Sequence, residues 1–173
     1  MSKILTINEK IRLICDKVKS GDEHLGNQCW FGDISEVLIL DKINIDFSLP
    51  EEYLNLHREF DGFTIDWCDF LSSTGQLVPS VREFKEILID WDYSAGYYPF
   101  AKDAGGNIFV FSPHDQKIWM FGMDYFDEPP KLIAESFDKF MNDCVLGKRY
   151  PEFVFIENNY FYDFLVEQGW VQE

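Results

Sequence analysis

The chain has 173 residues, a length typical of one domain, and 46% of them are hydrophobic and 17% aromatic. This composition excludes intrinsic disorder as the main state, because disordered chains are poor in aromatic and β-branched residues. Asp and Glu total 31 against 15 Lys and Arg, which gives a net charge of −16. That charge repels nucleic-acid phosphates and anionic membranes and attracts basic protein surfaces, although it also serves solubility alone.

The first half of the sequence predicts helices followed by a strand. Apolar residues recur at helical spacing in residues 7–18, and two further helices are predicted at 35–42 and 50–60. Residues 63–68 alternate between apolar and polar side chains, which predicts one half-buried strand. A short segment at 76–78 is expected to pair with that strand.

The second half predicts an antiparallel sheet. Ser80 and Glu83 have the spacing of a capping box that begins a helix. Residues 97–101, 108–111 and 117–121 are strand-like and are separated by turn-forming sequences, which predicts a meander. Three further elements are predicted after it: a helix at 132–145, a short strand at 153–156 and a last helix at 160–168. The fold class is therefore α+β, with helices packed against a mostly antiparallel sheet.

The cysteines and the N-terminal residues indicate the compartment. Cys15, Cys29, Cys68 and Cys144 lack the C-x-x-C spacing of a zinc ribbon or a redox pair. Charged residues interrupt the start of the chain, so no secretory leader is expected, and no apolar run is as long as a membrane span. We therefore expect a cytoplasmic protein whose thiols are free and buried.

Motifs for catalysis are absent from the sequence. His24, His57 and His114 form no metal-binding pattern, and no G-x-S-x-G motif is present. The turn Gly105-Gly106-Asn107 leads into a strand, whereas a phosphate loop leads into a helix. A catalytic triad remains an alternative, because its three residues must be close in space but not in sequence. We expect no enzyme activity, no cofactor and no metal.

Three motifs resemble the SUKH superfamily. Residues 49–53 (LPEEY) and 60–62 (FDG) are similar to its L-P-x-x-Y … N-G signature, with aspartate in place of the usual asparagine. Residues 99–109 resemble its hairpin motif, and residues 133–140 resemble its closing helix. The resemblance covers about 34–147, most of the chain.

This resemblance implies a SUKH-like α+β fold and a binding role without catalysis. Bacterial members are regarded as immunity proteins that neutralise toxins, many of them nucleases, and fungal members regulate cell-wall synthesis. We expect one domain over 1–173, in which 1–33 and 148–173 are extensions packed on the matched part. The expected function is immunity against a basic toxin domain by occlusion. An intracellular regulatory or scaffold module is the alternative, followed by a small-molecule binder or enzyme.

Two stretches of sequence combine acids with large aromatics, at 90–93 and at 124–128. Aromatic rings anchor interfaces, and acids orient a basic partner. For each stretch the alternative stays open that the rings fold into the core while the acids face water. Two further acids, on the polar side of the strand predicted at 63–68, are expected to extend this patch. The predicted partner-binding residues are Asp66, Asp69, Asp90, Trp91, Asp92, Tyr93, Asp124, Tyr125, Phe126, Asp127 and Glu128.

Overall fold

The computed structural model describes residues 4–31, 48–73, 75, 78–124 and 127–171. The first elements along the chain are α1 (Ile7–Lys19), α2 (Glu23–Gln28), β1 (Cys29–Phe31), α3 (Glu51–Glu59), β2 (Phe63–Ile65), β3 (Cys68–Phe70) and α4 (Val81–Leu88). They are followed by β4 (Tyr98–Asp103), β5 (Ile108–Phe111), β6 (Ile118–Phe121), β7 (Lys131–Ala134), α5 (Phe137–Lys139), the π-helix η2 (Phe140–Val145), the 3₁₀-helix η3 (Tyr150–Glu152) and α6 (Tyr160–Glu167).

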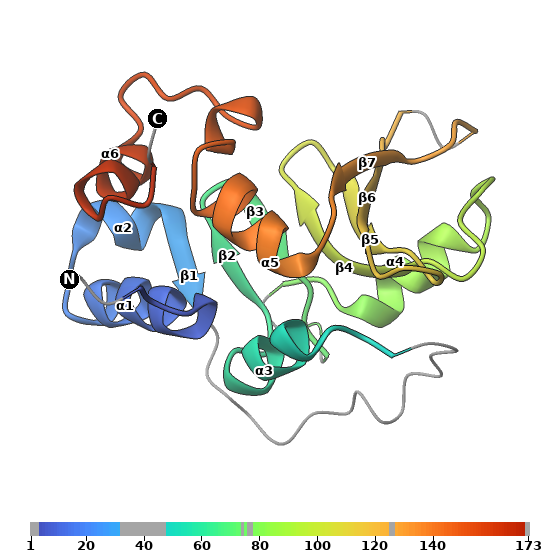
Figure 1. Ribbon diagram of the computed structural model, residues 1–173, viewed down its shortest axis with the longest axis horizontal. Coiled ribbons are helices and arrows are strands. Elements are labelled where there is room, and N and C mark those ends of the chain that lie inside the picture. Colours follow the sequence, from blue (N-terminus) through green and yellow to red (C-terminus); the bar gives the residue numbers. More distant parts are fainter. Residues whose placement is uncertain (1–3, 32–47, 74, 76–77, 125–126, 172–173) are drawn as a thin grey trace.

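In the described part of the chain, seven strands form one sheet whose spatial order equals their order in sequence. Every neighbouring pair is antiparallel. The predicted α+β class is confirmed, and the predicted meander corresponds to β4, β5 and β6. Figure 1 shows α1, α2 and α6 gathered beside β1 at one end of the molecule, with α4 at the other end.

Strand β5 is buried on both faces. Its residues alternate between the faces, as in any strand, so Phe109 and Phe111 share one side while Ile108 and Val110 share the other. The two phenylalanines belong to the larger core, which also includes side chains of α3, α5 and η2. The two aliphatic residues pack with Leu88 of α4 in a smaller core. The sheet is therefore a middle layer with helices on both faces.

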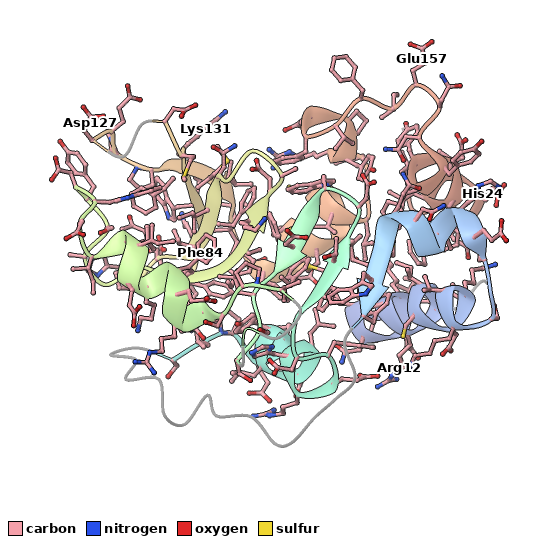
Figure 2. All side chains as sticks on the ribbon, turned by 180° about the vertical axis from the view of Figure 1, so that it is seen from behind. Arg12, His24, Phe84, Asp127, Lys131 and Glu157 are labelled. Carbon is pink, nitrogen blue, oxygen red and sulfur yellow. The ribbon has the colours of Figure 1, made fainter. Side chains whose placement is uncertain are left out.

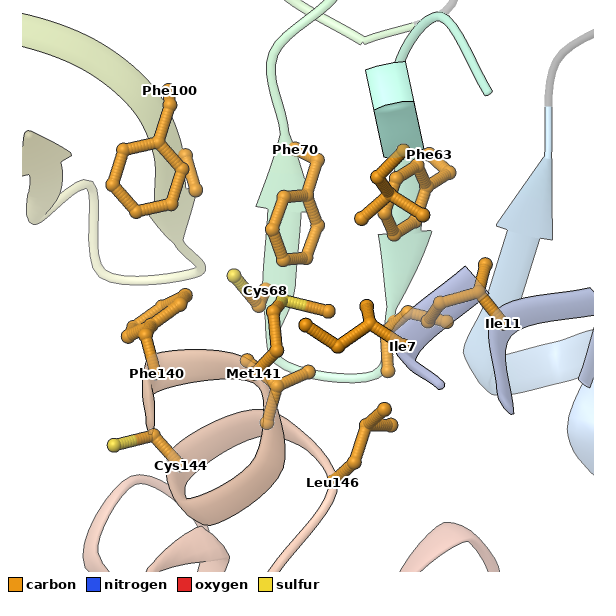
Figure 3. Close-up of a cluster of buried hydrophobic side chains, with 14 of the residues drawn as sticks. Ile7, Ile11, Phe63, Cys68, Phe70, Phe100, Phe140, Met141, Cys144 and Leu146 are labelled. Carbon is orange, nitrogen blue, oxygen red and sulfur yellow. The ribbon is translucent and has the colours of Figure 1, made fainter. Parts of the chain in front are cut away.

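The larger core continues from the meander to α1. Figure 3 shows Ile7 and Ile11 of α1 close to the cluster formed by Phe63 of β2 and by Met141 and Leu146 from the η2 segment. Ile11, Met141 and Leu146 are fully buried. The N-terminal helix thus shares its apolar core with the sheet.

A polar network joins both ends of the chain to the turn between β2 and β3. The Tyr150 hydroxyl donates to the Asp66 carboxylate, which also accepts from Gln28 Nε2 at 3.1 Å. Asn159 Nδ2 donates to the Tyr150 hydroxyl at 3.0 Å, and the Asn159 side chain also caps α6. Burial and the Asp66 carboxylate raise the pKa of Tyr150, so the phenol stays protonated as a donor.

The strand predicted at 63–68 is divided into two strands, β2 and β3. Asp66 has φ 45°, and together with Trp67 it forms the tight turn between them. A left-handed residue interrupts the extended alternation, which local sequence periodicity does not reveal. The prediction that Asp66 lies on the polar side of a strand was therefore wrong.

The helix predicted at 132–145 begins later than expected. Residues Lys131–Ala134 form β7 and pair with β6, and the helix begins only after Ser136, whose hydroxyl accepts from the N–H of Lys139 at 3.2 Å. The segment ends at Gly147, where a Cβ would lie 1.8 Å from the carbonyl oxygen of Asn142. Tertiary pairing along β6 thus overrides the helical pattern.

Two other predictions concern short segments. The strand predicted at 153–156 was wrong, because the chain leaves η3 through turns there and joins no strand. The helix predicted at 35–42 and most of the segment at 76–78 fall outside the described residues. The helices predicted at 7–18, 50–60 and 160–168 are confirmed as α1, α3 and α6.

His57 is the buried titratable side chain of α3. It is 3% exposed, its ring stacks on Tyr53, and its Nε2 lies 3.5 Å from Oδ1 of Asp61. The Asp61 carboxylate in turn accepts from the backbone N–H and the hydroxyl of Ser73 at 2.7 and 2.6 Å. Burial lowers the pKa of His57, while Asp61 and a backbone hydrogen bond to Phe60 act in the opposite direction.

The lowered pKa of His57 predicts a pH-dependent stability. Below the unfolded-state pKa of about 6.5, the unfolded chain binds a proton at this histidine more readily than the folded chain does. We expect this contribution to reduce the unfolding free energy as the pH falls from about 7.5 to about 5.5, and His57→Phe to reduce the loss. Urea titrations of both proteins across that range measure the difference, and parallel curves would contradict it.

The network around Tyr150 predicts that removing the hydroxyl of this residue lowers the unfolding free energy more than removing that of an exposed tyrosine. Tyr150→Phe leaves the Asp66 carboxylate without one of its donors, so we expect the unfolding free energy to fall by about 2 kcal/mol. The matched control is Tyr160→Phe, at an exposed position, which should change it by less than about 0.5 kcal/mol. Urea denaturation of the two variants provides the measurement, and equal losses would show that the network does not stabilise the fold.

Candidate protein-binding surface

The cysteines are buried and free. Burial raises the pKa of Cys29 to about 12 and that of Cys144 to about 11, and it raises the pKa of Cys15 and Cys68 as well. At neutral pH these thiols are protonated, whereas the thiolate is the form that attacks a substrate or binds a metal. Their surroundings therefore fit a structural role.

The histidines lie apart from one another. His57 is in the core, His24 stacks on Tyr160 with 4.2 Å between ring centroids, and His114 lines a groove beside the loop after α4. Over the described residues, His, Cys, Asp and Glu form no group of three or more that could hold a metal ion. None of the helices described is both long and apolar enough to cross a membrane.

The first predicted stretch, 90–93, lies in the loop that leaves α4. Tyr93 has φ 64°, and the Ser94 hydroxyl donates to the carbonyls of Leu88 and Trp91, which fixes the course of the loop. Tyr93 is 61% exposed, and Asp90 and Asp92 are exposed as well. This loop therefore presents one aromatic ring between two carboxylates.

Trp91 has a different position from its neighbours. It is partly buried and packs with the smaller core, and its ring lies edge-on to Phe121 of β6 with 6.2 Å between centroids. For this residue the inward-folding interpretation fits the structure, since the indole packs against the smaller core. Any role of Trp91 in partner binding stays a prediction.

The second predicted stretch, 124–128, follows β6. Asp124, Asp127 and Glu128 are exposed, and the two aromatic residues of the stretch, Tyr125 and Phe126, lie outside the described residues. Next to this stretch, the backbone N–H of Met123 donates to Asn107 Oδ1 at 3.2 Å. The β4–β5 turn therefore holds the start of this acidic loop.

The structure brings the two stretches together. Phe121, which packs against Trp91, lies only three residues before Asp124. In Figure 1 the loop after α4 and the loop between β6 and β7 lie at the same end of the molecule, and Figure 2 shows Asp127 at that end. The two stretches are thus parts of one region.

Asp66 and Asp69 have partners inside the protein. Asp66 belongs to the network with Tyr150 described above. Asp69 accepts from Lys102 Nζ at 2.7 Å and from the Thr64 hydroxyl at 2.8 Å across neighbouring strands. These contacts occupy both carboxylates, and the role of the two residues in binding stays a prediction.

Exposed aliphatic side chains were missed by the sequence analysis. Ile89 is 77% exposed, and Ile87 of α4 is exposed too, while Val81 and Leu88 face inward. Spacings of three and four residues from Val81 through Phe84 to Leu88 give the inward stripe and could have identified this. We define the acidic apolar surface as Glu86, Ile87, Ile89, Asp90, Asp92, Tyr93, Met123, Asp124, Asp127 and Glu128.

A groove of about 730 Å³ adjoins this surface. Trp91, Asp92, Tyr93 and Tyr97 contribute to its wall. Lys85 shares the groove, with its ammonium 5.6 Å from the centre of the Tyr98 ring. Aromatic rings beside a carboxylate suit a lysine or arginine side chain, because its alkyl stem packs on the rings while its charge meets the acid.

Comparison with known proteins identifies the family. No curated protein and no solved structure matched the chain. The model of the SMI1 / KNR4 family (SUKH-1) matches residues 42–143, which include α3, α4, α5 and all strands from β2 to β7. This match confirms the resemblance carried by the motifs at 49–62, 99–109 and 133–140. The chain belongs to the SMI1 / KNR4 family, SUKH-1.

Proposed function

We propose that this chain is an immunity protein that binds a basic toxin domain through the acidic apolar surface and has no enzyme activity of its own. Family membership is consistent with an immunity or a regulatory function. The observation that carries the proposal is the exposure of Ile89 and Tyr93, at 77% and 61%, among the carboxylates of Asp90 and Asp92.

The apolar members of this surface supply short-range affinity. Burying exposed apolar area in an interface gains about 25 cal/mol for each Å². Tyr93 is suited to be an anchor, because Ser94 and the left-handed backbone hold its loop in place before a partner arrives. A ring presented in advance loses little side-chain entropy when it is covered.

The acidic members supply long-range attraction. Five carboxylates, those of Asp90, Asp92, Asp124, Asp127 and Glu128, lie on two adjacent loops of a chain with net charge −16. Such a field speeds the approach of a basic protein and weakens as salt screens it, over roughly 8 Å at physiological ionic strength. Many nuclease toxins bind an anionic substrate, so a basic binding face is the surface that this field attracts.

The mechanism that we propose is occlusion. A partner held at the acidic apolar surface cannot admit its substrate, because acidic side chains occupy the place of the substrate's negative charge. A regulatory module would use the same surface on a partner that has no toxic activity. The identity of the bound protein therefore distinguishes the two functions.

Occlusion predicts that one copy of the chain inhibits one toxin domain. We expect the purified chain to abolish the activity of the toxin domain encoded beside its gene when one chain is present for each toxin, because a covered site has no residual access. Titration of the chain into a toxin activity assay measures this ratio. Binding without inhibition would favour the regulatory alternative, and activity of the chain itself on the toxin's substrate would exclude a purely binding role.

Charge reversal tests the surface directly. We expect the combined variant Asp90→Lys, Asp92→Lys, Asp124→Lys and Asp127→Lys to slow association with that toxin domain at least about tenfold at low salt. The matched control reverses four exposed acids elsewhere: Asp16, Glu52, Asp163 and Glu167. Stopped-flow association at several salt concentrations separates the two, and equal rates for both variants would place the interface elsewhere.

A further inference from the structure

Loops that are distant in sequence lie together at one end of the strands of the sheet. Cys68 pairs with Asp103 and Ile108 pairs with Phe121, so the β2–β3 turn, the β4–β5 turn and the β6–β7 loop all lie at the same ends of their strands. We call these loops, together with residues 153–158, the rim. The acidic loop that begins at Asp124 is one part of it.

Residues 153–158 join the rim at the β2–β3 turn. The Phe153 ring stacks on Trp67 of that turn, with 4.4 Å between centroids and an interplanar angle of 3°. Phe155 then projects from the loop and is 95% exposed, and Ile156 beside it is exposed as well. Figure 2 shows Glu157 of this loop and Asp127 of the acidic loop along the same upper edge, at its two ends.

The loop that carries Phe155 is held at both of its ends. Before it, Arg149 donates to the carbonyl of Ile133 at 2.7 Å and pairs with Glu152 at 2.8 Å. After it, Asn159 caps α6 and bonds to the Tyr150 hydroxyl. A loop fixed in this way presents its exposed ring in advance, which lowers the entropy lost when a partner covers the ring.

We propose that the 153–158 loop is a second docking point for the same basic protein partner, with Phe155 inserted into an apolar pocket of that partner. Continuity along the rim supports one partner, since the β4–β5 turn lies between the β2–β3 turn and the β6–β7 loop in the strand order, and its Ala104 and Gly105 are exposed. Charge supports a basic occupant, because Glu157, two residues after Phe155, is exposed. A second copy of the chain is disfavoured, since it carries the same net charge of −16.

This inference rests on the proposed function for its partner and is tested on that same toxin domain. We expect Phe155→Ala to raise the dissociation rate about 30-fold, as loss of an interface anchor does, with an association rate within about threefold of wild type. The matched control is Ile4→Ala, which removes another highly exposed apolar side chain, near the start of α1. Surface plasmon resonance measures both rates, and an unchanged urea midpoint shows that the variant is folded.

The outcomes separate this inference from the proposed function. Faster dissociation of Phe155→Ala together with slower association of the charge-reversal variant supports both. If only Phe155→Ala changes binding, by faster dissociation, the docking point at the rim is supported and the four reversed acids lie outside the interface. Slower association alone overturns the docking point and keeps the proposed function. Absence of binding by the wild-type chain overturns both, and equal effects of Phe155→Ala and Ile4→Ala overturn the docking point.

Discussion

The burial of β5 on both of its faces is the constraint on which the rest of the structure depends. Phe109 and Phe111 join the core that includes side chains of α3, α5 and η2, while Ile108 and Val110 pack with α4 on the opposite side. Between α4, which packs against the sheet, and β4, the chain forms a loop. That loop exposes Tyr93 and rests on β6 through the contact of Trp91 with Phe121.

The polar network around Asp66 has a similar effect at the other end of the molecule. A carboxylate in a tight turn accepts from Tyr150 and Gln28, which come from the two segments outside the family match. Hydrogen bonds to a charged acceptor are stronger than those between neutral groups, so this turn is a firm attachment point. The stacking of Phe153 on Trp67 adds an apolar contact at the same place and positions the loop that exposes Phe155.

Exposed carboxylates and exposed apolar side chains therefore occur together at the rim of the sheet. In the function that we propose, carboxylates on the loops attract a basic protein from a distance, while exposed rings and aliphatic side chains act only on contact. The carboxylates of Asp69 and Asp66 accept hydrogen bonds inside the fold. The exposed acids lie on other loops.

The sequence by itself determined the α+β class, the central meander, the capping box at Ser80 and the family, because these signals depend on residues a few positions apart. It also located the acidic stretches at 90–93 and 124–128. Only the tertiary structure decided that Trp91 packs inward while Tyr93 points to solvent, that 131–134 pairs as a strand, and that Asp66 binds Tyr150. Each of these depends on contacts between segments far apart in the chain, which no local pattern encodes.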